Sequence, residues 1–207
     1  MKNKLFFYTI TLILLNSCST TMKVKPLNKN GYFTIQSDIS QENIIDFKKI
    51  NLEEYNILII RNLGYDTSSN GYIVAEVATS GVNQKKYENY IINTIKQIGK
   101  FDKIYTLSEF ENYILQNNLT NDIKNLVEID ELNKLSNKGI KFLILDLDFK
   151  YLNGYNYLFK MKINDPISKI KVFDVGKPAF NFGGLDKVLF NPVFNNYIEW
   201  LKSNGKN

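Results

Sequence analysis

The apolar positions of the chain follow two different periods, which separate the predicted strands from the predicted helices. Residues 56–61 (NILIIR) form a short continuous apolar run, typical of a strand that is buried on both faces. Residues 140–151 (IKFLILDLDFKY) form the longest predicted strand, in which apolar and polar residues alternate from residue 145 onward. Further strands are predicted at 31–37, 72–78, 102–106, 155–164 and 168–175.

Apolar residues three and four positions apart predict the helices. The predicted helices cover 41–50, 83–98, 121–138 and 192–201, and a further helix begins at a capping box formed by Ser108 and Glu111. Ser40 caps the first of them, Gly99 and Gly139 end those over 83–98 and 121–138, and Pro192 lies in the first turn of the last. Strands alternate with helices, and three successive strands and a closing helix then follow. This order predicts an α/β (α+β) fold, a single domain over 31–207 with a mixed β-sheet and flanking helices.

The hairpin predicted after residue 151 has a register that its apolar residues select. A three-residue loop over 152–154 places Leu147 opposite Phe159 and keeps the lysines out of the core. It also places Asp146 opposite Lys160 on the other face of the sheet. The apolar face is predicted to include Ile59, Leu145, Leu147, Phe149 and Phe159.

The N-terminus combines positive charge, a short apolar stretch and a cysteine. The apolar residues 5–15 are too few to span a bilayer, which takes about 20 residues. Residues 15–18 (LNSC) resemble the lipobox of bacterial lipoproteins. The resemblance implies a signal peptide over 1–17, a lipid on Cys18, and a flexible tether over 18–30. The alternative is an ordinary secretory signal peptide that happens to end near a cysteine.

The resemblance also implies a location. Ser19 follows Cys18, where an aspartate would resemble an inner-membrane retention signal. We therefore expect a lipid anchor in the outer membrane and a domain on its periplasmic face, with the inner membrane and the cell surface as alternatives. Two or three acyl chains hold a protein on a membrane far more firmly than one chain does.

Two residue counts exclude whole classes of chemistry. The chain has no histidine, which excludes Ser-His-Asp and Cys-His catalysis and His-ligated zinc. Its single cysteine, Cys18, excludes an intrachain disulfide and a cysteine metal cluster. The net charge is +5, but no lysine-rich block with interleaved aromatic residues occurs, so nucleic-acid binding is not predicted. No cofactor is predicted apart from the lipid on Cys18.

Two carboxylates and one guanidinium are candidate site groups. Asp146 and Asp148 share one strand face, where they could bind Mg²⁺ or Ca²⁺; the alternative is a solvated face neutralised by lysines of the next strand. Arg61 ends the predicted strand 56–61 and suits a carboxylate or phosphate ligand. The alternative for Arg61 is an ion pair with a neighbouring acid.

Residues 176–191 predict a long connection rich in glycine, proline and phenylalanine. Long connections and hairpin tips are common places for binding groups. We expect a partner surface there, formed by Tyr151, Tyr155, Tyr157, Phe180 and Phe182. The alternative is that the phenylalanines pack beneath the loop as part of the core.

With the lipobox, the order of elements is similar to that of small periplasmic lipoproteins with the fold of the TolB amino-terminal domain. Curli-secretion and penicillin-binding-protein-activator lipoproteins are similar as well. The resemblance covers most of 40–207 and rests on element order. It implies a non-enzymatic binding, assembly or adaptor protein that acts on a periplasmic or envelope protein. The competing hypothesis is a periplasmic metal- or serine-dependent hydrolase, for which the sequence holds no nucleophile motif.

Overall fold

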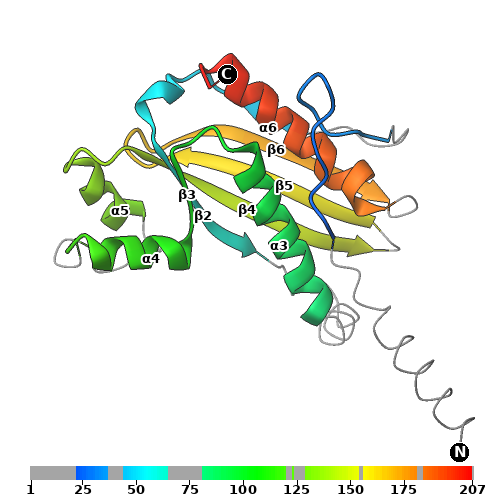
Figure 1. Ribbon diagram of the computed structural model, residues 1–207, viewed down its shortest axis with the longest axis horizontal. Helices are drawn as coiled ribbons and strands as arrows, with labels where there is room; N and C mark the ends of the chain where they lie inside the picture. The colour runs from blue at the N-terminus through cyan, green and yellow to red at the C-terminus, as the bar shows by residue number, and fades with distance from the viewer. Residues whose placement is uncertain are drawn as a thin grey trace, which may run out of the picture.

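The computed structural model describes residues 22–36, 44–64, 81–119, 123, 129–153, 156–180 and 184–206. Its strands are β1 (Ile44–Phe47), β2 (Ile57–Gly64), β3 (Lys103–Thr106), β4 (Phe142–Asn153), β5 (Asn156–Asp165) and β6 (Ile170–Phe180). They form one sheet in the order β1-β6-β5-β4-β2-β3 (Figure 1). β2 runs parallel to β3 and β4, and the other neighbouring pairs are antiparallel. The predicted mixed sheet is confirmed.

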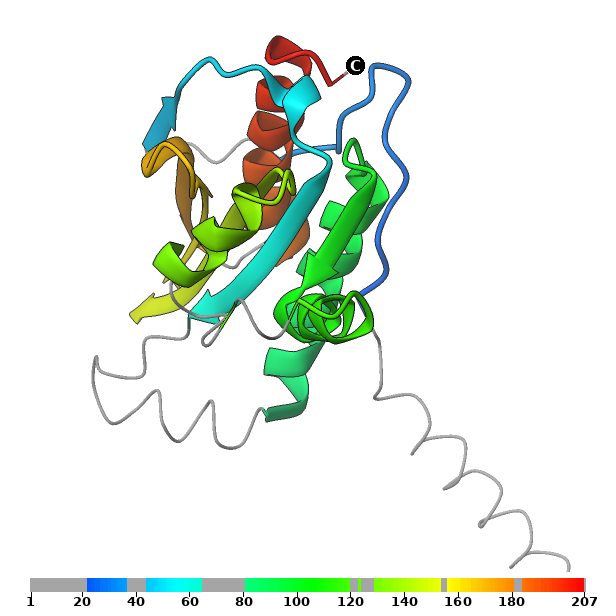
Figure 2. The ribbon, with the colours of Figure 1, turned by 90° about the vertical axis from the view of Figure 1, so that its left-hand side faces the viewer.

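Helices cover both faces of this sheet (Figures 1 and 2). They are α3 (Gly81–Ile98), α4 (Leu107–Gln116), α5 (Ile129–Ser136) and α6 (Asn191–Ser203), with a 3₁₀ turn η1 (Leu52–Glu54) and a π-helical turn η2 (Asp186–Phe190). The larger core cluster joins α3, η2 and α6 to one face, and the smaller cluster joins α4 and α5 to the other. The α+β prediction with flanking helices is therefore confirmed.

β2 is buried on both faces because successive side chains of a strand point to opposite sides. Leu58 and Ile60 belong to the larger cluster, whereas Ile59 belongs to the smaller one with Ile144. The prediction that Ile59 shares a face with Leu145 is wrong. In the parallel β2–β4 register Ile59 lies opposite Ile144, so it shares the face of that residue instead.

The β4–β5 hairpin keeps the predicted faces but not the predicted register. Leu147 pairs with Met161, two residues beyond the predicted partner Phe159. A register shift between Tyr151 and Asn153 inserts one extra residue into β4, so that Asn153 pairs with Asn156. A slip of two residues leaves each side chain on its own face, which preserves the core. On the polar face it places Asp146 opposite Lys162, and Asp148 opposite Lys160.

Two predictions near the N-terminus are wrong. Residues 32–36 form no strand, and the segment predicted as a helix over 41–50 contains β1. β1 pairs antiparallel with β6, and this pairing supplies the hydrogen bonds that a short helix would have made internally. The predicted strand 72–78 lies outside the described residues.

The predicted helices 83–98 and 192–201 are confirmed as α3 and α6, and Gly99 has a φ of +66° just past the end of α3. The capping box of α4 is two residues earlier than predicted: Thr106 and Glu109 form it in place of Ser108 and Glu111. Thr106 ends β3, so the strand passes directly into the helix. Of the helix predicted over 121–138, residues 129–136 form α5, whereas the described residues 123, 137 and 138 are not helical.

The predicted long connection over 176–191 is mostly regular structure. Residues 176–180 continue β6, and 186–190 form η2. Glycine at position 176 leaves room for the Lys160 side chain, because a Cβ there would lie only 3.2 Å from Cγ of Lys160. Pro178 lies beyond the end of β1, where β6 has no neighbour on that side among the described strands, so its missing N–H removes no ladder bond.

Candidate functional site

Arg61 and Asp146, which the sequence analysis treated separately, form one bidentate ion pair. Arg61 Nε donates to Asp146 Oδ1 at 2.8 Å, and Nη2 donates to Oδ2 at 3.0 Å. The register of β2 against β4 passes from Ile60 to Asn62, so Arg61 is the extra residue of a bulge. Arg61 lies two residues after Ile59, which shares a face with Ile144, so alternation places the Arg61 side chain on the face that carries Asp146. Arg61 lies inside β2 rather than at its end.

The Asp146 carboxylate accepts three hydrogen bonds in this cluster. Asn164 Nδ2 of β5 donates a third hydrogen bond, at 3.0 Å, to Asp146 Oδ2. A cation that used Asp146 as a ligand would compete with the Arg61 guanidinium for its oxygens. Among the described residues, no group of three His, Cys, Asp or Glu side chains is placed to hold a metal ion. Asp148, the second candidate ligand, is half-buried on the same strand face and lies opposite Lys160.

A second charged cluster lies on this face at β6. Asp174 is only 4% exposed and forms ion pairs with Lys171 and Lys160. Lys160 Nζ lies 3.0 Å from Asp174 Oδ1. Burial alone would raise the pKa of Asp174, but the hydrogen bonds and charges of the two lysines outweigh it and lower that pKa. The polar face of β4, β5 and β6 therefore carries acids and bases that neutralise one another.

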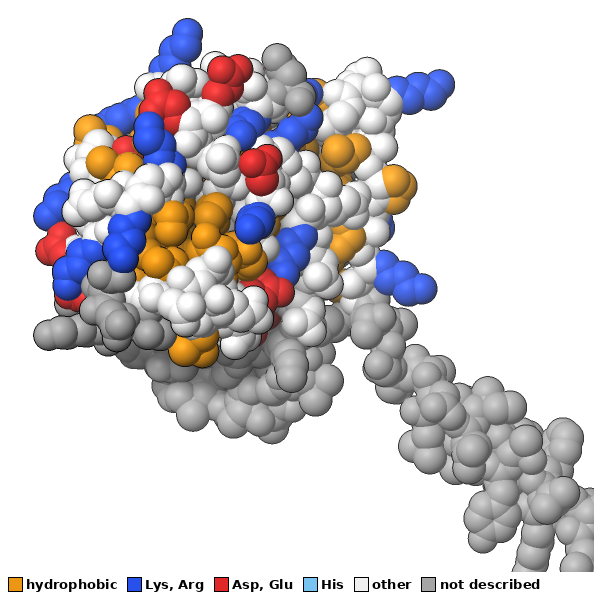
Figure 3. Space-filling view, turned by 60° about the vertical axis from the view of Figure 1, so that its left-hand side comes forward, with side chains coloured by type: hydrophobic (Ala, Val, Ile, Leu, Met, Phe, Trp, Pro, Cys, Tyr) orange, Lys and Arg blue, Asp and Glu red, His pale blue; other side chains and the backbone are white. Residues whose placement is uncertain are grey.

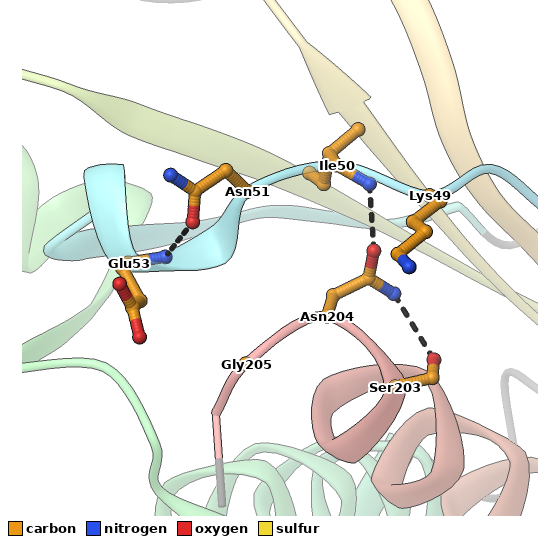
Figure 4. Close-up of a pocket in the computed structure, with 7 residues that line it drawn as sticks. All are labelled: Lys49, Ile50, Asn51, Glu53, Ser203, Asn204 and Gly205. Carbon is orange, nitrogen blue, oxygen red and sulfur yellow. Dashed lines mark hydrogen bonds between the residues drawn. The ribbon is translucent and has the colours of Figure 1, made fainter.

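An open pocket of about 470 Å³ lies between the segment 49–53 and the end of α6 (Figure 4). Its floor is Asn204, whose Oδ1 accepts from the Ile50 N–H at 2.6 Å and whose Nδ2 donates to Trp200 O at 2.7 Å. The Asn204 carbonyl accepts from the Leu52 N–H at 3.2 Å. These bonds join the C-terminus of α6 to the chain that enters β2. The amide at the floor of the pocket has a structural role.

The residues predicted as a partner surface divide into two groups. Tyr157 is half-buried and stacks on Phe149 with ring centroids 5.7 Å apart, and Phe180 is half-buried at the end of β6. The side chains of Tyr151, Tyr155 and Phe182 lie outside the described residues. Phe190, from the same predicted connection, is fully buried in the core.

A further aromatic cluster lies beside β3 and was missed because its residues come from two elements. Tyr105 of β3 and Tyr113 of α4 have ring centroids 5.5 Å apart, and Lys103 Nζ lies 5.2 Å from the centroid of Tyr113. Both tyrosines contact the buried Phe110. Hydrophobic side chains gather among lysines and acids on the side of the molecule that carries α4 and α5 (Figure 3). The cluster is the outer margin of the smaller core.

Residues 22–36 form an irregular N-terminal strap that crosses α6 (Figure 1). The strap is held at Phe33, which is 2% exposed. The Phe33 N–H donates to Asn195 Oδ1 at 2.8 Å, and Asn195 Nδ2 donates to Phe33 O at 2.9 Å. Lys202 Nζ lies 3.9 Å from the ring centroid of Tyr32. The strap is thus part of the folded domain.

The strap corrects the predicted tether. Residues 22–30 were assigned to a flexible tether over 18–30, but Met22, Val24 and Leu27 are partly buried against the larger core. Gln97 Nε2 of α3 also donates to Lys25 O at 3.1 Å. A free tether would therefore be confined to 18–21, outside the described residues.

Comparisons with known proteins return partial structural likenesses. No protein-family model matches the sequence, and no curated protein is similar to it in sequence. The chain is similar to the PelC dodecamer from Paraburkholderia phytofirmans, with a TM-score of 0.37 and 9% identity over 75% of this chain and 97% of that one. The LpoB C-terminal domain from Salmonella enterica has a TM-score of 0.34 and 13% identity over 61% of this chain and 83% of that one. Such low scores establish neither a family nor a function. Within the described ranges, no helix is both long and apolar enough to cross a membrane.

Proposed function

We propose that the protein is a lipid-anchored binding or assembly protein of the bacterial envelope that catalyses no reaction. The observation that carries the proposal is the lipobox-like run 15–18, which places the single cysteine, Cys18, directly after a short apolar stretch. In this proposal Cys18 carries the lipid, the anchor lies in the outer membrane, and the domain faces the periplasm. Its partner is a periplasmic or envelope protein.

The strap bears on how such an anchor would hold the domain. Cys18 is four residues before Met22, and an extended chain spans at most about 3.6 Å per residue. The lipidated residue would lie within about 14 Å of the folded surface. A domain held so closely presents its far side to other envelope proteins and has little freedom to turn over.

The charged face supports a binding role over a catalytic one. Asp146 accepts three hydrogen bonds from Arg61 and Asn164, and Asp174 is held between two lysines. A general base or metal ligand needs lone pairs that a substrate or cation can reach. Three lone pairs of Asp146 accept protein donors, and the carboxylate of Asp174 faces the ammonium groups of Lys171 and Lys160.

Metabolic labelling with a fatty-acid probe tests the anchor. We expect the wild-type chain to carry the label and to sediment with outer membranes, and Cys18→Ser to lose both properties. Ser19→Ala is the matched control, since it changes the next residue and leaves the thiol in place. Equal labelling of wild type and Cys18→Ser would contradict the proposal. In-cell crosslinking of the wild-type chain, followed by identification of the captured protein, tests the binding role.

A further inference from the structure

The outer edge of β1 has no neighbouring strand among the described residues. β1 lies at one end of the sheet, and no described strand lies beyond it (Figure 2). The Lys48 N–H donates to Val172 O at 2.9 Å, so residues 44, 46 and 48 direct their backbone groups toward β6. By alternation, the N–H and C=O groups of Ile45 and Phe47 point away from the sheet. These four groups have the geometry to accept a further strand.

The side chains of Ile45 and Phe47 extend the core to this edge. They are 50% and 40% exposed, and both lie on the face that α6 covers farther in. The ring of Phe47 stacks on buried Phe173, with centroids 5.6 Å apart and planes 3° from parallel. Two rows of apolar side chains therefore cross the sheet and end in half-exposed side chains on β1. One row is Leu145, Ile163, Phe173 and Phe47, and the other is Leu147, Met161, Val175 and Ile45.

The opposite face of β1 carries an acid, Asp46, that shares one lysine with a second acid. Asp146, Lys162, Asp174 and Asp46 stand in one row across the sheet, so two acids are directly opposite each other at its end. Lys171 holds Asp174, and its Nζ is 3.8 Å from Asp46. Like charges directly opposite are destabilising, and a base beyond Asp46 would restore the alternation of charge.

We infer that the edge of β1 binds an extended segment of a partner protein, which adds to the sheet as a strand with the pattern apolar, basic, apolar. The apolar residues continue the rows of Ile45 and Phe47. The basic residue lies opposite Asp46, where the strands form a close pair without hydrogen bonds. The inference rests on the proposed binding role but not on the lipid anchor.

A second copy of the chain fits this edge less well. Within the bounds of β1, two antiparallel copies satisfy the outward groups of both Ile45 and Phe47 only if Ile45 of each copy pairs with Phe47 of the other. That register places Asp46 against Asp46 in the close pair. The repulsion between these carboxylates disfavours self-association in this register.

Two nine-residue peptides test the inference on the full chain in detergent. One has Val-Lys-Val at its centre and the other Val-Glu-Val, and both are otherwise uncharged. We expect the lysine peptide to bind about fivefold more tightly in fluorescence anisotropy, and Asp46→Lys to reverse that preference. Bound peptide should protect the amides of Ile45 and Phe47, but not that of Asp46, from hydrogen exchange. Asp46 is exposed, so Asp46→Lys is expected to fold normally.

Two further variants separate edge binding from general stickiness. Replacing Ile45 and Phe47 together by threonine retains β-propensity, and we expect about a tenfold weaker affinity for the lysine peptide. Leu115→Thr is the matched control, because Leu115 is 60% exposed on α4 and should leave binding unchanged. An unchanged peptide preference in Asp46→Lys, or no protection of the two amides, would overturn the inference. So would a β1-dependent homodimer. A lipid-labelled protein that fails these tests would leave the proposed anchor standing.

Discussion

Replacing Phe190 by alanine tests whether the stretch 176–191 belongs to the core or to a partner surface. Phe190 ends η2 and is completely buried. Its ring centroid lies 5.0 Å from that of Phe159, 5.5 Å from that of Phe149 and 5.6 Å from that of Tyr90. The side chain thus joins α3, β4 and β5 at one point of the larger core.

The magnitude follows from the contacts that the substitution removes. Truncating a fully buried phenylalanine to alanine costs about 3–5 kcal/mol, because transfer free energy is lost and a cavity remains. In a domain of this size, 1 kcal/mol corresponds to about 2–4 °C in Tm. We therefore expect Phe190→Ala to lower Tm by roughly 6–20 °C, measured by circular dichroism, and to lower the free energy of unfolding in urea by a matching amount.

Leu115→Ala is the control for this measurement, because Leu115 is 60% exposed on α4. We expect its free energy of unfolding to stay within about 0.5 kcal/mol of the wild-type value. Phe190→Leu, which keeps most of the volume, should fall between the two. If Phe190→Ala unfolds like the control but loses crosslinking to a partner, the assignment of Phe190 to the core is wrong.

Two further measurements follow. A double-mutant cycle of Arg61→Met and Asp146→Asn should give a coupling of about 1–2 kcal/mol, since both side chains are three-quarters or more buried; a coupling near zero would contradict a structural ion pair. Burial and the charge of Asp186 raise the pKa of Tyr90 in the folded protein to about 12. Between pH 10 and 12, the Tyr90 hydroxyl therefore loses its proton in the unfolded chain but keeps it in the folded chain. The free energy of unfolding should therefore fall across this range, and Tyr90→Phe should flatten the decline.

The sequence predicts most of the regular elements because their apolar residues follow one period without interruption. The run 57–60 has no polar residue and is buried on both faces of the sheet. The spacing of Tyr87, Ile91, Ile95 and Ile98 predicts α3 up to Gly99, and Pro192 marks the start of α6. The faces of β4 and β5 also follow from alternation alone. In these segments local geometry and burial favour the same structure.

Where local patterns are ambiguous, tertiary contacts decide. Ile44, Ile45 and Phe47 fit a helical period as well as a strand, and pairing with β6 selects the strand. A bulge sets the hairpin register, and the parallel pairing of β2 with β4 brings Arg61 to Asp146, 85 positions along the chain. The lipid on Cys18 is a prediction from sequence alone. The open edge of β1 is a property of the assembled sheet, because only the final strand order determines which strand lies at the edge.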